Sequence, residues 1–206
     1  MFNAPRVMVL DVETLRGADE VGGWHNSHLM GLAVAVVSDS LSGEARAFFE
    51  HQAEELFAWL RKADLVVGFN IVGFDFKVLS AYDDGTLAQL PVFDILADVR
   101  RRLGFRLSLA HLGEHTLGTS KTADGLQSLA WIREGRMDLV EEYCRADVRI
   151  TEQLFRHGLE AGWLRYFSRD GQLMELRLDW DLERLAGPRR EERTAHGDSR
   201  HAGRRP

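Results

Sequence analysis

The chain has 206 residues, of which 45% are apolar and 28% are charged, and its formal net charge is -6 at pH 7. This length fits one α/β domain with a sizeable core rather than two domains, and the acidic balance argues mildly against nucleic-acid binding because phosphate contacts need Lys and Arg. Cys144 is the only cysteine, the N-terminal residues lack a signal-peptide pattern, and no apolar run approaches the roughly 20 residues that cross a bilayer, so we expect a cytoplasmic protein without a disulfide or a membrane partner.

Apolar periodicity and turn-forming residues predict the elements of the first half of the chain. A run rich in β-branched residues over positions 7–12 indicates a buried strand. A loop with three glycines is expected over positions 16–26. A hairpin with strands at 30–38 and 44–49 is expected next, followed by a helix at 52–62 and a strand at 65–69. A helix at 74–82, a short strand at 91–95 and a helix that ends near Gly104 complete this half.

Helices dominate the expected second half. Ser108 is placed to cap a helix that stops at Gly118, and Asp124 is placed to cap a helix over 126–134. The strongest helical pattern runs from Met137 to Gly158. Two short segments, 163–167 and 172–178, flank a turn and predict a small C-terminal β-hairpin.

This order of elements predicts an α/β fold, in which a mixed five-stranded sheet is covered by helices on both faces. We expect one domain over residues 1–186. From Gly187 onward Arg, Gly, His and Pro dominate and large apolar residues are absent, so residues 187–206 are predicted to be a disordered, Arg-rich tail.

Two carboxylates stand at the end of the first predicted strand. Asp11 and Glu13 are two residues apart, so their side chains point to the same face. They would repel each other unless a cation lay between them, and a hard divalent cation takes oxygen ligands of this kind. The Asp-x-Glu triplet alone carries little weight, because it is expected by chance on the order of once in a chain of this size.

Two further acidic residues have positions that suggest more than solvation. Asp75 begins a predicted helix directly after a buried strand, where helix N-capping is the simpler interpretation and metal binding is compatible with it. Asp147 lies near the apolar side of the long helix, one turn after Tyr143. A carboxylate there is costly unless it is paired or bound to metal, and an ion pair with Arg145 or Arg149 is the alternative.

Three segments together resemble the exonuclease motifs of the DnaQ-like (DEDD) superfamily, whose fold is RNase H-like. They are Asp11-Val12-Glu13-Thr14, Gly68-Phe69-Asn70 leading to Phe74-Asp75, and Tyr143-Cys144-Arg145-Ala146-Asp147-Val148. Their order, spacing and element type match together, over about residues 7–155. Tyr143 stands four residues before Asp147, and Glu142 stands where a second branch has His, so the chain resembles the tyrosine (DEDDy) branch. It is similar to predicted exonucleases related to the proofreading domain of family-B DNA polymerases.

The resemblance implies a metal-dependent 3′-5′ exonuclease that releases nucleoside 5′-monophosphates from single-stranded nucleic acid, with DNA favoured over RNA. Two divalent ions, Mg²⁺ or Mn²⁺, would be held by Asp11, Glu13, Asp75 and Asp147. Tyr143 would orient the attacking water, since its ordinary pKa of ≈ 10 makes it a poor base at neutral pH.

Substrate contacts are also implied by the resemblance. Thr14 and Leu15 would hold the terminal nucleotide, Asn70 would hydrogen-bond the substrate, and Phe74 would stack on a base unless it packs in the core. Lys121 is a candidate phosphate contact or an ordinary solvated lysine.

Several other features allow two interpretations. The arginines of residues 100–106 form either a basic patch for phosphate or a solvated helix end. His111 and His115 are four apart but lack the Glu of a zinc HExxH motif, so they are interpreted as surface or core residues. Asp94 follows a strand, where it either caps a helix or adds a fifth acidic group to the site.

Alternative functions remain open at this point. They are a non-catalytic nucleic-acid-binding domain with the same fold and an RNase H-like endonuclease. The chain carries no P-loop and no polymerase domain, so a helicase or polymerase partner would be a separate protein.

Overall fold

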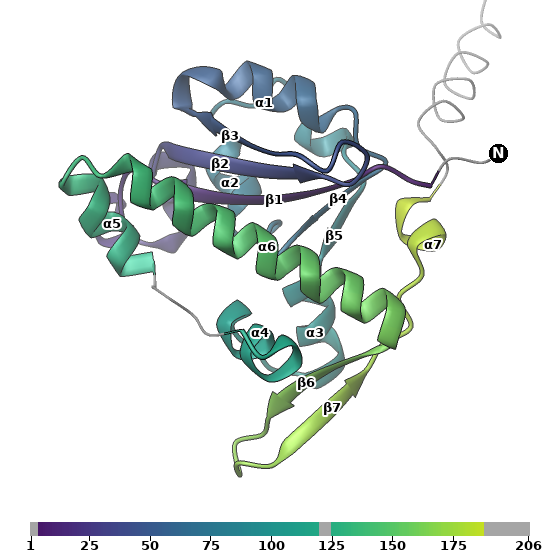
Figure 1. Ribbon diagram of the computed structural model, residues 1–206. Helices are drawn as coiled ribbons and strands as arrows, with labels where there is room; N and C mark the ends of the chain where they lie inside the picture. The colour runs from purple at the N-terminus through teal and green to yellow at the C-terminus, as the bar shows by residue number, and fades with distance from the viewer. Residues whose placement is uncertain (1–3, 120–124, 188–206) are drawn as a thin grey trace, which may run out of the picture.

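The computed structural model describes residues 4–119 and 125–187. Within these ranges five strands form one sheet in the order β3-β2-β1-β4-β5 (Figure 1). They are β1 (Val7–Thr14), β2 (Leu32–Asp39), β3 (Ala45–Phe49), β4 (Leu65–Gly68) and β5 (Val92–Asp94). Lys121, the predicted cap Asp124 and the predicted tail from residue 188 onward lie outside the described ranges.

The sheet is mixed, as the sequence predicted. β1 pairs antiparallel with β2, and β2 pairs antiparallel with β3. β1 pairs parallel with β4, and β4 pairs parallel with β5. The predicted C-terminal hairpin is confirmed as β6 (Trp163–Phe167) paired antiparallel with β7 (Leu173–Arg177). β1 is therefore a central strand, covered on both edges by neighbouring strands.

The helices are α1 (Ala53–Leu60), α2 (Asp75–Leu79), α3 (Ile95–Leu103), α4 (Leu109–Leu117), α5 (Gly125–Arg133), α6 (Met137–Ala161) and α7 (Leu182–Ala186). Short 3-10 helices are η1 (Ala18–Val21), η2 (Trp24–Leu29), η3 (Glu50–Gln52) and η4 (Leu87–Gln89). α7 and the 3-10 turns escape sequence prediction because they are too short to show an apolar period. None of the helices that the structure describes is both long and apolar enough to cross a membrane.

Local capping explains where two of these helices begin and end. The Ser108 hydroxyl accepts a hydrogen bond from the His111 amide at 3.1 Å, and α4 ends at Gly118 with φ 72°, as predicted. The Asp94 carboxylate accepts from the Ala97 amide at 3.1 Å and caps α3, which ends at Gly104 with φ 80°. Glycine tolerates these left-handed conformations without steric cost.

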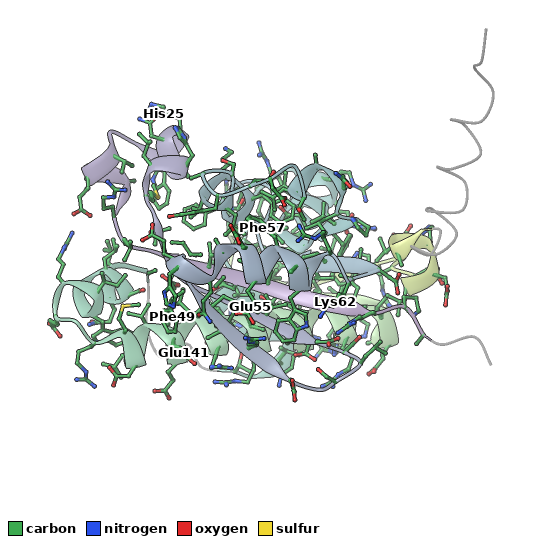
Figure 2. The ribbon with its side chains drawn as sticks, turned by 90° about the horizontal axis from the view of Figure 1, so that it is seen from above. His25, Phe49, Glu55, Phe57, Lys62 and Glu141 are labelled. Atoms are coloured by element: carbon green, nitrogen blue, oxygen red, sulfur yellow. The ribbon has the colours of Figure 1, made fainter. Side chains whose placement is uncertain are left out.

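Alternate residues of β1 pack into two separate cores. Val7 and Val9 face the core that includes residues of α6, whereas Met8, Leu10 and Val12 face the core beneath α1 and α2. Figure 1 shows α6 crossing one face of the sheet, and Figure 2 shows α1, with Phe57, lying over the strands from above. The predicted coverage by helices on both faces is confirmed, and β1 gives one set of side chains to each layer.

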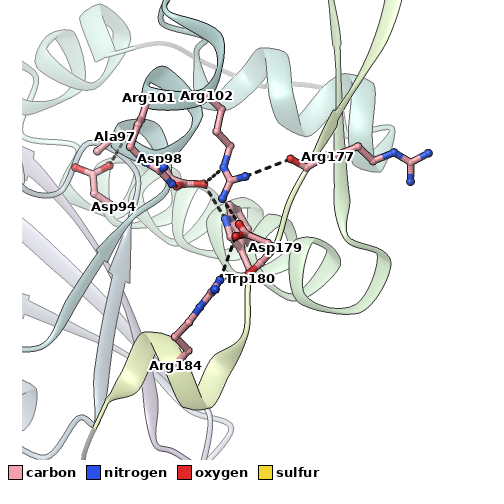
Figure 3. A network of polar contacts seen from close by, with 9 residues as sticks. All are labelled: Asp94, Ala97, Asp98, Arg101, Arg102, Arg177, Asp179, Trp180 and Arg184. Carbon is pink, nitrogen blue, oxygen red and sulfur yellow. Dashed lines mark hydrogen bonds and ion pairs between the residues drawn. The ribbon is translucent and has the colours of Figure 1, made fainter.

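A polar network ties the C-terminal segment to α3 (Figure 3). The Asp98 carboxylate accepts hydrogen bonds from Arg102 Nε at 2.7 Å and from Trp180 Nε1 at 2.8 Å, and it also pairs with Arg101. Burial alone would raise the pKa of Asp98, but the hydrogen bonds from Arg102 and Trp180 outweigh it and hold this pKa below its ordinary value. Trp180 is itself buried against the α6 core.

Asp98 is expected to make folding stability pH-dependent. Because its pKa is lower in the folded state, its contribution is present above the unfolded-state pKa of ≈ 3.9 and is lost as the pH falls through the folded-state pKa. Asp98→Asn should therefore lower the free energy of unfolding by on the order of 2 kcal/mol at pH 7. The gap between variant and wild type should close below about pH 4.

Urea unfolding of both proteins at pH 7, 5 and 3 measures this gap. Asp170→Asn is the matched control, since Asp170 is exposed in the turn between β6 and β7 and its loss should leave stability unchanged. A gap that stays constant from pH 7 to pH 3 would contradict the assignment of the network.

Candidate metal centre

The central strand places two carboxylates on the α6 side of the sheet. Asp11 and Glu13 continue the face of Val7 and Val9, which is packed against the α6 core. The register between β1 and β2 shifts between Glu13 and Thr14, so the regular ladder ends directly after the second carboxylate. The two acidic groups thus stand at the end of a buried strand, where the β1 backbone is paired with β2 and the pairs with β4 have ended at Val9.

α6 brings the third carboxylate to the same place. The strand-facing side of α6 buries Val140, Tyr143, Cys144 and Val148, and Asp147 lies one turn after Tyr143. One carboxylate oxygen from each of Asp11, Glu13 and Asp147 lies within 4.8 Å of the others, and all three residues are half-buried. Arg145, one of the two arginines considered as ion-pair partners of Asp147, bonds to Glu141 at 2.8 Å.

Asp75 lies beside this group and not within it. It is the first residue of α2 and only 2% exposed, and its Oδ1 accepts a hydrogen bond from the Val12 amide at 3.1 Å. The N-cap position belongs to Phe74, so the predicted capping role is replaced by this contact across to β1. Asp75 is therefore attached to the strand segment between the other two carboxylates.

The four carboxylates affect one another electrostatically. Burial, followed by the negative charges of Asp75 and Asp147, raises the pKa of Asp11 well above its ordinary value. Burial is also the main cause that raises the pKa of Asp75, with the charges of Asp94 and Glu13 adding to it. Oxygen ligands gathered in this way suit a hard divalent cation, which removes the repulsion that the carboxylates otherwise impose on one another.

Tyr143 joins the site through its hydroxyl group. The side chain is 7% exposed, and the Trp131 ring of α5 contacts it edge-on with centroids 6.4 Å apart. Burial and the negative charges of Asp147 and Glu13 raise its pKa, and its hydroxyl is hydrogen-bonded to Asp147. The hydroxyl stays protonated at neutral pH, so it can orient a polar group but cannot act as a base.

Cys144 contacts the metal-binding candidate Asp11 directly. Its Sγ lies 3.3 Å from both the backbone oxygen and Oδ2 of Asp11. Burial raises the pKa of the thiol, which therefore stays protonated and donates to this pair of oxygens. Cys144 is buried, and this contact joins it to the candidate metal centre.

Ser128 of α5 is a site residue that sequence reasoning missed. Its hydroxyl donates to Glu13 Oε2 at 2.7 Å, and the side chain is fully buried. The two residues are 115 positions apart, so no local motif relates them. Ser128 fixes one orientation of the Glu13 carboxylate, as hydrogen-bonding partners behind a metal ligand commonly do.

The hydroxyl of Ser128 is expected to matter for metal affinity. Partners of this kind typically change metal affinity or activity by about 10- to 100-fold when they are removed. Ser128→Ala should therefore weaken Mn²⁺ binding by about this factor in isothermal titration calorimetry. Ser38→Ala, at another buried serine, is the control and should bind Mn²⁺ as the wild type does. Equal affinity in Ser128→Ala and wild type would remove Ser128 from the site.

The loop between β4 and α2 is shaped by Asn70, Gly73 and Asp94. Asn70 has φ 66°, and a Cβ atom on Gly73 would lie 2.4 Å from Asn70 Oδ1. Asp94 accepts from the amides of Asn70 at 2.9 Å and Val72 at 3.2 Å while it caps α3. The capping interpretation of Asp94 is confirmed, and its negative charge contributes to the raised pKa of Asp75, while its place in the site stays a prediction.

The residues predicted to bind substrate differ in accessibility. Thr14 is buried and its hydroxyl donates to the Arg16 backbone oxygen at 3.0 Å, whereas Leu15 is 37% exposed. Phe74 is half-buried, and Asn70 Oδ1 accepts from Arg106 Nη2 at 3.3 Å. Lys121 lies outside the described residues. Their substrate roles stay predictions.

The predicted basic cluster divides into two parts. Arg101 and Arg102 pair with Asp98, and Arg102 pairs with Asp179 as well, so these two serve the network of Figure 3. Arg106 is exposed and reaches Asn70 beside the site. The predicted histidine pair packs edge to face with centroids 4.4 Å apart, and His111 Nε2 accepts from the Phe167 amide at 3.0 Å. That bond gives His111 a structural role.

Fold and site together define a mixed α/β protein with a candidate metal centre of acidic residues between its central strand and its longest described helix. No family model matches the chain, and no curated protein matches it.

Proposed function

We propose that this protein is a metal-dependent 3′-5′ exonuclease with an RNase H-like fold, of the DnaQ-like DEDDy type. The observation that carries the proposal is the meeting of Asp11, Glu13 and Asp147 within 4.8 Å, from segments that are far apart in the chain. Asp75 is buried alongside them, and Tyr143 is hydrogen-bonded to Asp147. These are the five residues that the three sequence motifs single out.

The reaction is hydrolysis of the terminal phosphodiester bond. Water adds its oxygen to phosphorus, the bond from phosphorus to the 3′ oxygen breaks, and a nucleoside 5′-monophosphate leaves a new 3′ hydroxyl on the strand. Two divalent ions, Mg²⁺ or Mn²⁺, would supply Lewis-acid stabilisation of the attacking and leaving oxygens. Asp11, Glu13 and Asp147 would hold the ion beside the water, and Asp75 would support the second ion.

Tyr143 has a positioning part in this proposal. Its buried hydroxyl keeps its proton, so it orients the attacking water by a hydrogen bond. Cys144 and Ser128 hold the carboxylates of Asp11 and Glu13 in place. Each of these three side chains would act through geometry, and a bound metal ion would supply the acidity that deprotonates the water.

The substrate is proposed to be the 3′ end of a single strand, with DNA favoured over RNA. The resemblance to proofreading domains supports this choice. A helicase or polymerase would be a separate partner that supplies the strand. We place the reaction in the cytoplasm.

A labelled single strand tests the proposal. Purified protein with Mn²⁺ should release mononucleotides stepwise from the 3′ end of a 5′-labelled oligonucleotide, and EDTA should stop the reaction. A strand blocked by a 3′ phosphorothioate linkage should resist. Strand binding without cleavage would favour the non-catalytic alternative, and internal cuts in a circular strand would favour the endonuclease.

A further inference from the structure

An exposed aromatic side chain contacts Phe74, the residue that directly precedes Asp75. Trp24, in η2 between β1 and β2, is 68% exposed. Large apolar side chains usually bury most of their surface, so an exposed tryptophan is informative when its position is fixed. Leu15, at the end of β1, and Leu126, at the start of α5, are also exposed, at 37% and 78%. Both adjoin segments that carry site residues.

The backbone around Trp24 is fixed by its own hydrogen bonds. Gly22 and Gly23 take φ values of 80° and 122°, which favour glycine, and the Gly23 amide donates to the Ala18 backbone oxygen at 2.7 Å. The hydroxyl of the buried Ser27 donates to the Trp24 backbone oxygen. Figure 2 shows the neighbouring His25 at the outer end of this segment, away from the sheet. The loop therefore holds the indole ring at the surface.

One contact connects Trp24 to the carboxylates. Its ring meets the Phe74 ring edge to face, with centroids 5.9 Å apart and planes at 66°. Phe74 directly precedes Asp75, whose Oδ1 is bonded to the Val12 amide between Asp11 and Glu13. Phe74 is half-buried, so Trp24 offers more free aromatic surface than the residue that the sequence singled out for stacking.

The negative charge of the protein indicates that a nucleic-acid strand needs contacts other than those to its phosphates. The protein carries a formal net charge of -6, and the site itself is acidic, so phosphate contacts alone provide little attraction. Every nucleobase has a π-face, so an aromatic ring binds any base in a single strand without regard to its identity. An exonuclease that steps along a strand needs contacts of this sequence-tolerant kind.

We propose that Trp24, supported by Phe74, is a stacking subsite for a nucleobase of the single strand whose 3′ end lies at the carboxylates. This inference rests on the proposed exonuclease function. Removing an aromatic side chain on which a base stacks typically lowers affinity by about 5- to 150-fold. Trp24→Ala should raise the KM for a single-stranded oligonucleotide by this factor and leave kcat within about twofold. Trp24→Phe should retain most of the wild-type affinity.

Abasic substrates locate the base that stacks. Oligonucleotides with one abasic site, moved stepwise from the 3′ end, should raise the wild-type KM most at one position. At that position Trp24→Ala should show no further loss. Phe167→Ala is the control, since Phe167 is 40% exposed on the hairpin, and its KM should equal that of the wild type.

The outcomes separate the inference from the function on which it rests. A wild-type protein that melts cooperatively but neither binds nor cleaves any strand overturns the function and the subsite together. A wild type that cleaves, beside a Trp24→Ala variant with unchanged KM, overturns the subsite alone. An abasic penalty that is undiminished in Trp24→Ala at every position also overturns it, because another group must then contact the base.

Discussion

Asp11→Asn is expected to lower the rate of strand cleavage by about 10³-fold or more, because it removes the several kcal/mol of transition-state stabilisation that a bound metal provides. Asp11 is the carboxylate whose charge interacts with those of Glu13, Asp75 and Asp147. Asparagine has nearly the same shape and still accepts from Cys144, so the loss is specific to charge. The measurement is kcat/KM on a 5′-labelled oligonucleotide at saturating Mn²⁺.

The same variant should separate activity from stability. Without metal, Asp11→Asn should melt at least as high as the wild type, because one buried negative charge is gone from an acidic cluster. Mn²⁺ at about 100 times its Kd should stabilise the wild type by about 2.7 kcal/mol, which raises Tm by roughly 5–10 °C for a chain of this size. The variant should show little of this gain.

Asp170→Asn, in the hairpin turn, is the matched control and should respond to Mn²⁺ as the wild type does. Differential scanning calorimetry with EDTA or Mn²⁺ gives all six melting temperatures. If Asp11→Asn retained the full metal-dependent rise and the wild-type rate, Asp11 would not be a metal ligand.

Gly158→Ala is expected to destabilise the fold by about 2–3 kcal/mol through overpacking. A Cβ atom at position 158 would lie 2.2 Å from Trp180 Cζ3 and 2.3 Å from Trp180 Cε3. The Trp180 ring is buried and bonded to Asp98, so it cannot move aside freely. The better helix propensity of alanine, about 1 kcal/mol, offsets only part of this cost.

Urea unfolding measures the effect, with the exposed Glu160→Ala in the same helix as a control that should remain near the wild type. Trp180→Leu should lower stability by itself. In the double variant the clash is absent, so its loss of unfolding free energy should be clearly smaller than the sum of the losses in the two single variants. Strict additivity, or a Gly158→Ala protein as stable as the wild type, would show that the contact between α6 and Trp180 has room for a methyl group.

The sequence predicted the layers of the fold because alternation and helical periodicity are strong in this chain. β1 sends alternate residues to two cores, and α6 buries one regular stripe, so both were visible as patterns. The carboxylates Asp11, Glu13 and Asp147 were visible for the same reason, since each lies within a recognisable element. Their approach to within 4.8 Å depends on packing and could be expected only through the resemblance.

Contacts between segments that are far apart in the chain could not be predicted from the sequence. Nothing in the sequence distinguishes Ser128 from other serines in helices, but the packing of α5 places its hydroxyl 2.7 Å from Glu13 Oε2. The capping interpretation of Asp75 was reasonable for an acid at a helix start, but tertiary structure turned the side chain to the Val12 amide. The glycines around Trp24 predicted a loop, and the hydrogen bonds that order this loop depend on its tertiary surroundings.

The order of the metal-binding candidates along the chain has a consequence for synthesis. Domains begin to fold from the N-terminus while translation continues. A growing chain that already contains the whole sheet, through β5, still lacks Asp147, because α6 follows all five strands. The three-carboxylate group cannot close until α6 has left the ribosome and packed on β1. A nascent chain therefore carries no complete centre, and any chemistry of this site begins only with the nearly finished domain.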